Sequence, residues 1–597
     1  MNTNTIPTWN LDDIFTDFSS EKYISMYEKF SGNIRELEKM LEHKPPQDKD
    51  GLENSLTGII KLYNETGSIY EELFSYSYCR YSTDTSEPQA LSEINRIEAI
   101  AVGFSTAVVK LRNYLFKAGQ LLDEVIAGSD YLGQFRFFFD EQLMLREKQM
   151  TPEMENLAAD LARSGADSWE RLQQTLSSAT QIVWDEETGE KKTSVELRAL
   201  ADNPDESVRR KAFEKEIELW KSIEVPMAFA LNGVKGASNS VNSRRNFKTT
   251  LERSTLQARI TSDTLDAIIS AMTTSLPVFR KYLKLKAGLL GKEKIAFYDL
   301  FAPVGESSMS FSYKEATDFI VDKFTNFSTD LGNFARKAVD KGWIDAKPRQ
   351  NKVGGAYCTG FHVSGASRIL CNFNGSFNAL STIAHELGHA YHNDVLKEAP
   401  EIYRDFPMTL AETASIFCET IVLESALETA SGDDKLNLIE HELMESTQII
   451  VDILSRFIFE KNVFNKRIEK ELSAAEFCEL MIDAQKQTYG DAMNEKLMHP
   501  YMWAAKGHYY SQELAFYNFP YSFGKLFGLG LYSRFRDEGE SFPEKYRSIL
   551  YMTGNASAED VTAIAGYDIT KKDFWQSSLS IMEKRVEQFE DLCKNRK

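Results

Sequence analysis

The chain has 597 residues, of which 42% are hydrophobic, and a formal net charge of −20 at pH 7. This length is sufficient for two or three domains with a large core, and a mean hydropathy of −0.37 is typical of a soluble globular protein. Nucleic acid and anionic membranes are excluded as expected partners, because the negative charge would repel both. The sequence has no run long enough to span a membrane, no signal-peptide pattern and six scattered cysteines without a CxxC motif, so we expect a cytoplasmic protein.

Helical periodicity dominates the first half of the chain. Charged residues alternate with apolar ones at spacings of three and four over 21–42, 54–81, 91–126, 151–178 and 263–289. Residues 181–193 have instead the pattern of a strand, a turn and a strand. We place a boundary just after this pattern, which predicts an N-terminal helical domain over 1–195 and a second domain over 196–597.

Two short strands are predicted at 354–363 and 367–374, which are rich in β-branched and aromatic residues and bounded by glycine. A peptide could add as a further strand along such an edge, through backbone hydrogen bonds that do not require a particular side chain. Gly354, Gly355, Ala356 and Tyr357 are therefore candidate peptide-binding residues. The alternative is that the glycines only form turns.

A helix predicted from about residue 376 to 396 contains the motif His385-Glu386-x-x-His389. A helix advances about 100° per residue, so His385, His389 and also His392 lie on one face. Two histidines four residues apart, with a glutamate after the first, can hold zinc and activate a water molecule. Because the motif can also arise by chance, this interpretation requires a third ligand further along the chain.

Glu412 is the candidate for that third ligand, on a second helix that begins after Pro407. The alternative is a capping box, in which Thr409 and Glu412 only stabilise the start of the helix. Glu419 lies two turns further on the same face, where it could accept the other ring N–H of a ligating histidine. Exposure to solvent is the alternative for Glu419.

These motifs resemble those of the oligoendopeptidase F group in the thimet oligopeptidase family of zinc peptidases. The resemblance covers nearly the whole chain, and is carried by residues 9–15, 352–358, 384–391 and 507–524. It implies a mainly α fold, in which many helices enclose a deep substrate channel and a small β-sheet lies next to the HExxH helix. It also implies that residues 196–597 form the catalytic domain and that each chain holds one Zn²⁺ ion.

The resemblance further implies roles for individual residues. Glu412 would complete the zinc site, and His508 with one tyrosine would contact the scissile carbonyl. The candidate tyrosines are Tyr510, Tyr517 and Tyr521; their spacing differs from that of the thimet branch, so the sequence does not decide among them.

The chemistry expected of these residues is hydrolysis of internal peptide bonds in short oligopeptides. A zinc-activated water would attack the carbonyl while Glu386, as general base, takes its proton and passes it to the departing amine. Loss of Glu386 should therefore stop the reaction but spare the metal. A carboxypeptidase of similar fold and a catalytically silent peptide-binding protein are the alternatives, and the sequence indicates no oligomeric state.

Overall fold

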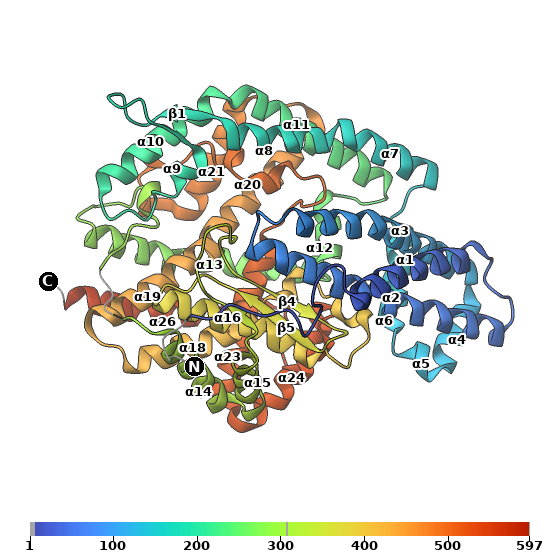
Figure 1. Ribbon diagram of the computed structural model, residues 1–597. Helices are drawn as coiled ribbons and strands as arrows, with labels where there is room; N and C mark the ends of the chain where they lie inside the picture. Colours follow the sequence, from blue (N-terminus) through green and yellow to red (C-terminus); the bar gives the residue numbers. More distant parts are fainter. Residues whose placement is uncertain (1–5, 306–308, 596–597) are drawn as a thin grey trace. The chain divides into compact units, whose positions relative to one another are not determined.

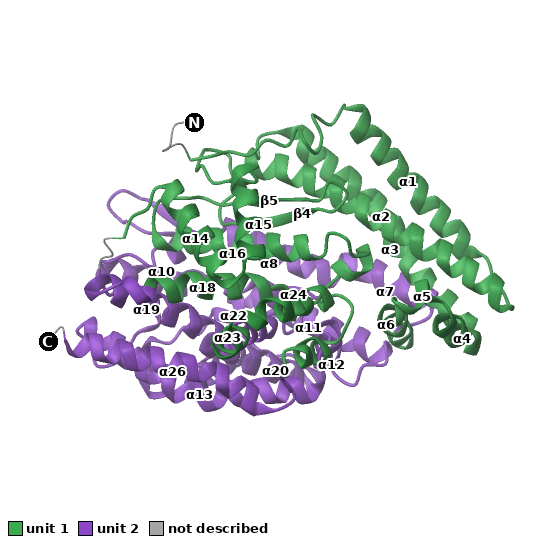
Figure 2. Cartoon of the chain, turned by 90° about the horizontal axis from the view of Figure 1, so that it is seen from below, with its two compact units in different colours: residues 1–148, 309–426, 531–566 green, residues 149–308, 427–530, 567–597 purple. Residues whose placement is uncertain are grey.

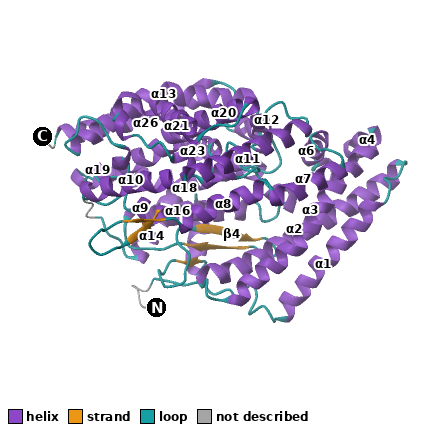
Figure 3. Ribbon diagram, turned by 90° about the horizontal axis from the view of Figure 1, so that it is seen from above, coloured by secondary structure: helices purple, strands orange, loops and turns teal. Residues whose placement is uncertain are grey.

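The computed structural model describes residues 6–305 and 309–595. Helices make up most of the described chain, together with two small sheets (Figures 1 and 3). The chain forms two compact units whose segments are interleaved (Figure 2). The first unit comprises residues 1–148, 309–426 and 531–566, and the second comprises 149–308, 427–530 and 567–597. The boundary expected after residue 195 falls inside the second unit. The division of the chain into an N-terminal helical domain and a catalytic domain remains a prediction.

The first unit contains most of the predicted N-terminal helices, a three-stranded sheet and the HExxH helix. Its elements are α1 (Glu21–Glu42), α2 (Lys49–Thr83), α3 (Pro88–Ala118), α4 (Gln120–Gly128), α5 (Asp130–Gly133), α6 (Arg136–Glu147), α14 (Tyr313–Phe327), α15 (Thr329–Asp340), β3 (Ile344–Asp345), β4 (Tyr357–Phe361), β5 (Ala366–Leu370), α16 (Phe377–Val395), η2 (Glu401–Arg404), α17 (Met408–Ala411), η7 (Gly539–Ser541), α24 (Phe542–Met552) and α25 (Ala558–Ile564).

The second unit consists of helices and one short hairpin. Its elements are α7 (Pro152–Ser164), α8 (Ala166–Ala179), β1 (Gln181–Val183), β2 (Lys191–Thr193), α9 (Ser194–Arg198), α10 (Glu206–Ser222), α11 (Glu224–Arg244), α12 (Thr250–Gln257), α13 (Ser262–Leu289), η1 (Phe297–Asp299), α19 (Gly432–Thr447), η3 (Gln448–Asp452), α20 (Ile453–Glu469), α21 (Ala474–Tyr489), η4 (Gly490–Ala492), η5 (Glu495–Leu497), α22 (Met502–Ala505), η6 (Gly507–Tyr510) and α26 (Lys572–Lys594). Two helices, α18 (Thr413–Thr429) and α23 (Phe519–Glu538), continue from one unit into the other. Within the described chain, no helix is both long and apolar enough to cross a bilayer.

The predicted helices are confirmed, but two of them are interrupted. The range 91–126 is divided between α3 and α4 at Gly119, whose φ of +60° belongs to the left-handed region that glycine adopts without strain. The range 151–178 is divided between α7 and α8 at Gly165. The apolar spacing in the sequence continues across both glycines, so the sequence pattern alone did not reveal these breaks.

The three-stranded sheet has the order β3–β5–β4, with β3 parallel and β4 antiparallel to β5. The β4–β5 hairpin pairs Tyr357 with Leu370 and Phe361 with Ala366. The predicted strand at 354–363 was too long, since residues before Tyr357 form a turn in which Gly355 has a φ of +76°. The sequence did not predict β3, which is only two residues long.

Helix α16 packs against both β4 and β5, and α2 contacts β4. Phe361 is fully buried in one hydrophobic cluster with Leu73 and Tyr76 of α2. The expected mainly α fold, with a small sheet next to the HExxH helix, is therefore confirmed. The sheet and the surrounding helices pack on α16 from several sides, and these contacts fix the position of the HExxH motif.

Candidate metal centre

Helix α16 has one buried face and one face that carries histidines. The helix begins after Ser376, whose Oγ accepts a hydrogen bond of 3.1 Å from a backbone N–H in the first turn. Leu380 and Leu387 are fully buried. His385 and His389 lie one turn apart, with side chains that are 26% and 24% exposed. The helix therefore holds two imidazoles side by side at the edge of the core.

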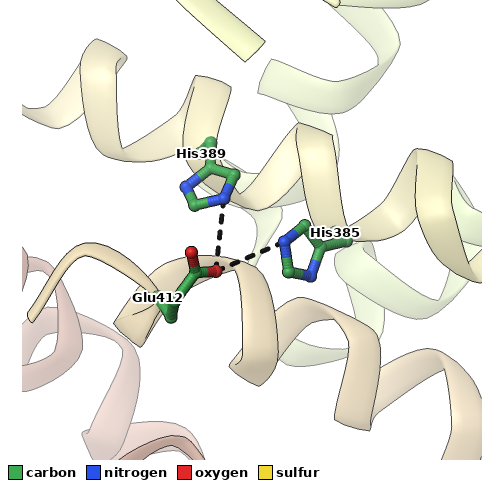
Figure 4. Close-up of side chains that lie close together, drawn as sticks. All are labelled: His385, His389 and Glu412. Carbon is green, nitrogen blue, oxygen red and sulfur yellow. Dashed lines mark ion pairs between the residues drawn. The ribbon is translucent and has the colours of Figure 1, made fainter. Parts of the chain in front are cut away.

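Glu412 places a carboxylate next to these two imidazoles. It lies between α17 and α18, where the helical path is broken, and its side chain points towards α16 (Figure 4). Its Oε2 atom is 3.3 Å from Nε2 of His385 and 3.4 Å from Nε2 of His389. The three donor atoms lie within 4.8 Å of one another, and form the one such group of His, Cys, Asp or Glu found among the described residues.

The two separations between the Glu412 carboxylate and the imidazoles fit a tetrahedral metal ion. Nitrogen and oxygen ligands about 2.1 Å from zinc, at tetrahedral angles, would lie about 3.4 Å apart. A charge-assisted hydrogen bond between an imidazolium and a carboxylate would be shorter, about 2.7–2.9 Å. The observed 3.3 and 3.4 Å match the first arrangement. Two imidazoles and one carboxylate could therefore hold a divalent cation and leave a fourth position for another ligand.

The surroundings of Glu412 are inconsistent with the capping-box alternative. Thr409 lies inside α17, whose N-cap is Pro407, so it does not occupy the cap position that a capping box requires. The Glu412 carboxylate instead accepts a hydrogen bond of 2.8 Å from Ser415 Oγ. This contact orients the carboxylate from the α18 side while its Oε2 faces the histidines.

Glu419 lies on α18 next to the other nitrogen of a site histidine. Its Oε2 is 3.3 Å from Nδ1 of His385. An imidazole that binds a cation through Nε2 carries its proton on Nδ1, and a carboxylate at that nitrogen fixes both the tautomer and the ring orientation. The structure thus places Glu419 where a partner of a ligating histidine would lie.

The carboxylates strongly affect the charge of His385. Burial disfavours the charged imidazolium, but hydrogen bonds with Glu412 and Glu419 outweigh burial and raise the pKa of His385 to about 10. Burial acts against the ionised form of Glu412 as well, yet the two histidines hold its pKa well below its usual range. Without a cation, the site is therefore expected to hold a proton on His385 at neutral pH.

Glu386 is a nearly buried carboxylate that is 6% exposed. Its pKa is raised, mainly by burial, while the nearby His385 and His389 act in the opposite direction and Glu412 raises it further. The Oε2 atom of Glu386 is buried and has no hydrogen-bond partner in the described part of the chain. An unpaired buried acceptor is unfavourable, so this oxygen is suited to receive a proton from a water molecule or substrate at the site.

Gly388 allows α16 and α18 to approach more closely than any side chain would permit. A Cβ atom at this position would lie 2.6 Å from both the carbonyl oxygen of Ala414 and Cα of Ser415. The backbone of α18 therefore packs directly on α16, one residue before His389. Sequence reasoning did not identify this residue, although a glycine in the middle of a predicted helix is a signal of close packing.

His392 shares a helix face with the two site histidines but does not join them. It is buried, and its Nε2 lies 3.1 Å from the backbone oxygen of Leu550 and 2.8 Å from Oγ1 of Thr553. Burial lowers the pKa of His392 to about 3, so the ring is neutral. His392 therefore links α16 to the C-terminal end of α24, within the first unit.

His508, Tyr517 and Tyr521 form a group in the second unit. The rings of His508 and Tyr517 are 5.8 Å apart, and the hydroxyls of the two tyrosines are 2.7 Å apart. Nδ2 of Asn518 lies 2.7 Å from Nε2 of His508, while its Oδ1 accepts a hydrogen bond of 2.9 Å from Arg456. The arginine thus orients the amide so that Nδ2 donates to His508, which leaves the ring proton on Nδ1.

His508 is also neutral. Burial, together with the nearby charge of Arg456 and of two lysines, lowers its pKa to about 2. A neutral imidazole with its proton on Nδ1 is a hydrogen-bond donor at that nitrogen across the physiological pH range. Asn518 was not a predicted site residue, because the contact that gives it this role depends on Arg456, which lies 62 residues earlier in the chain.

The remaining predicted site residues lie elsewhere. Tyr510 is 0% exposed and belongs to a hydrophobic cluster with Trp503, so the structure does not bring it to the His508 group. Gly355 lies in the turn before β4, and Tyr357 is the first residue of that strand, with its hydroxyl 2.6 Å from Ser82 Oγ. Because β4 is the outermost strand of its sheet, its backbone could accept a further strand on one side.

The sequence matches two family profiles. Residues 199–581 match Peptidase family M3, and residues 119–181 match the profile described as Oligopeptidase F. The chain is similar to oligopeptidase PepF of Bacillus subtilis, with 23% identity over 98% of this chain and 87% of the relative. It is also 24% identical to the chromosomal oligoendopeptidase F of Lactococcus lactis subsp. cremoris, over 99% of this chain and 98% of the relative.

Solved structures share the fold. Oligoendopeptidase F from Enterococcus faecium superposes with a TM-score of 0.69 at 19% identity, covering 97% of this chain and 99% of that one. PZ peptidase A superposes with a TM-score of 0.71 at 15% identity, covering 96% and 99% of the two chains. The resemblance inferred from the sequence motifs is thus confirmed over both halves of the chain. This chain belongs to peptidase family M3, in its oligoendopeptidase F group, and is a metalloendopeptidase.

Proposed function

We propose that this chain is a zinc endopeptidase that hydrolyses internal bonds of short peptides, with one Zn²⁺ per chain held by His385, His389 and Glu412. The observation that carries the proposal is the group of three donor atoms within 4.8 Å of one another. The separations of 3.3 and 3.4 Å between the Glu412 carboxylate and the two imidazoles support zinc, since they are close to the edge of about 3.4 Å expected for a tetrahedral zinc site. When bound, the ion would polarise the substrate carbonyl and lower the pKa of a coordinated water molecule.

Glu386 acts as the general base in this proposal. Its unpartnered buried Oε2 can accept the proton of the attacking water, and its raised pKa favours holding that proton. The same carboxyl then donates the proton to the departing amine nitrogen, which restores the carboxylate. Burial of Glu386 also keeps bulk water from supplying or removing protons during the reaction.

Glu419 orients His385 through Nδ1, and its distance of 3.3 Å supports this role. His508 donates its Nδ1–H to the carbonyl oxygen of the scissile bond, where negative charge develops. Tyr517 or Tyr521 supplies a second donor, and the hydrogen bond between their hydroxyls supports a shared role for the pair. Tyr510 is not included, since its full burial keeps it from a substrate.

The peptide backbone binds alongside β4, next to Gly354, Gly355, Ala356 and Tyr357. The position of β4 at the edge of its sheet supports this mode, which accepts many side chains. The names oligopeptidase and oligoendopeptidase of the relatives support short peptides as substrates. The six cysteines form no disulfide with one another in the described part of the chain, which supports a reducing compartment and is consistent with a cytoplasmic location.

Cleavage of an internally quenched peptide with both ends blocked tests this proposal. We expect the wild type to cut internally, and Glu386→Gln to retain its zinc while its rate falls by about 10²–10⁴-fold, which is typical for loss of a general base. Glu398→Gln, at an exposed position shortly after the same helix, is the matched control and should keep wild-type activity. Cutting that requires a free terminus would instead indicate a carboxypeptidase, and zinc binding without any cleavage would indicate a peptide-binding protein.

A further inference from the structure

A cavity of about 580 Å³ lies within the second unit, among α11, α12, α20 and the loop that contains Phe516. Helix α11 contacts both α12 and α20, so the walls of the cavity belong to one packed group of helices. Small-molecule sites in proteins typically have volumes of about 300–1,000 Å³. All residues that line this cavity belong to the second unit, whereas the candidate metal ligands belong to the first. The cavity is therefore distinct from the metal centre.

The walls of the cavity carry positive charge. Arg244, Lys248, Lys461 and Arg467 line it, and none of the described lining residues is acidic. Arg467 lies 3.5 Å from Glu471, but the other three cations form no ion pair with any residue in 6–305 or 309–595. In a chain with a net charge of −20, such a concentration of unpaired cations favours an anionic ligand.

The floor of the cavity is aromatic. Phe247, Phe464 and Phe516 line it and are only 8%, 5% and 4% exposed. Ile468, also in the lining, is 75% exposed, which is unusual for a large apolar side chain. A ligand that fits this surface has an apolar part next to its anionic group.

One buried polar atom in the lining lacks a partner. Asn242 is 2% exposed, and its Nδ2 donates a hydrogen bond of 3.2 Å to Thr250 Oγ1. Its Oδ1 is buried and has no hydrogen-bond partner in the part of the chain that the structure describes. A buried acceptor without a donor is unfavourable, so a ligand with an N–H group would gain a hydrogen bond here.

The C-terminal residue of a peptide combines these three chemical features: a carboxylate, a side chain and a backbone N–H. We propose that the cavity binds the C-terminal residue of a short peptide that has a free carboxylate and an apolar or aromatic side chain. The carboxylate lies among Arg244, Lys248 and Lys461, the side chain packs on the phenylalanines, and the N–H donates to Asn242. This binding does not require that the chain hydrolyse the peptide, so the binding proposal and the proposed function can be refuted independently.

Calorimetric titration of the full-length, metal-loaded chain tests the ligand chemistry. N-acetyl-phenylalanine is the probe, because it carries the carboxylate, the aromatic ring and the N–H. We expect its amide, which lacks the charge, to bind at least tenfold more weakly. The ester analogue, in which oxygen replaces the N–H, should bind two- to tenfold more weakly.

Variants locate the binding. The triple variant Arg244→Gln/Lys248→Gln/Lys461→Gln should bind the probe at least tenfold more weakly, and Ser240→Trp, at an exposed position in the lining, should block the cavity. The control Lys221→Gln/Lys294→Gln/Lys466→Gln removes the same charge from exposed positions outside the cavity and should bind as the wild type does. The proposal is overturned if the probe does not bind, if acid and amide bind equally, or if the two triple variants bind alike.

Discussion

Replacing Gly388 with alanine tests whether the close contact between α16 and α18 sets the geometry of the metal site. The new Cβ would lie 2.6 Å from two backbone atoms of α18. Ordinary contact begins near 3.4 Å, so one helix must move by about 0.8 Å. Because both atoms belong to backbone, no flexible side chain can relieve the overlap.

Such a shift is large on the scale of a metal site. Added to the present separations of 3.3 and 3.4 Å, it would place Glu412 about 4 Å from the two histidine nitrogens. Functional geometry generally tolerates about 0.5 Å, so we expect Gly388→Ala to bind zinc about 10–100-fold more weakly than the wild type. Competition with a chromogenic chelator measures this affinity.

A matched control separates the contact from the general effect of alanine on a helix. Gly32 lies within α1 and has nothing within 4 Å of its would-be Cβ, so Gly32→Ala should stabilise the helix by up to about 1 kcal/mol and leave zinc affinity unchanged. Wild-type zinc affinity in Gly388→Ala, with the fold intact by circular dichroism, would refute the reasoning.

Three further predictions concern charge around the site. Glu419→Gln should weaken zinc binding about 10–100-fold, because His385 loses the partner that fixes its tautomer. An unchanged zinc affinity in the chelator assay would show that Glu419 does not orient His385. Zinc binding to the metal-free chain at pH 7 should release about one proton, since His385 has a pKa of about 10 and must lose its proton to bind the metal. Calorimetry in buffers of different ionisation enthalpy should show this release, and identical heats in all buffers would contradict it. His392 has a folded-state pKa of about 3 and an ordinary value of 6.5, so only the unfolded chain takes up its proton between these values, and stability is lost as the pH falls through that range. At pH 5 this loss is about 2 kcal/mol for His392, and urea unfolding of His392→Gln should show a correspondingly smaller decrease between pH 7 and pH 5.

Local sequence patterns predicted the helices and the two histidines because both depend on residues close together in the chain. The helical spacing of His385 and His389 follows from 3.6 residues per turn, whatever surrounds the helix. The breaks at Gly119 and Gly165 were not predicted, since apolar periodicity continues across them. A single glycine is tolerated in a helix often enough that it does not by itself mark an end.

Long-range contacts account for what the sequence could not determine. The role of Glu412 depended on its approach to His385 and His389, which lie on another helix more than 20 residues earlier in the chain. The choice among the tyrosines depended on burial: Tyr510 lies in the core, whereas Tyr517 lies beside His508. No local pattern distinguishes these environments, because aromatic residues are common in both.

The interleaved order of the two units determines when the peptidase site can form during synthesis. The first unit has no residues between 426 and 531, yet His392 of the HExxH helix bonds to Leu550 and Thr553, beyond that interval. At about 5–20 residues per second, a ribosome needs about 5–20 s to add the intervening 104 residues, 427–530. During that time His385, His389 and Glu412 have already been synthesised, but helix α16 lacks its contact with Leu550 and Thr553. The nascent chain therefore cannot complete a mature hydrolytic centre until its last segments are made, which delays activity until synthesis is nearly finished.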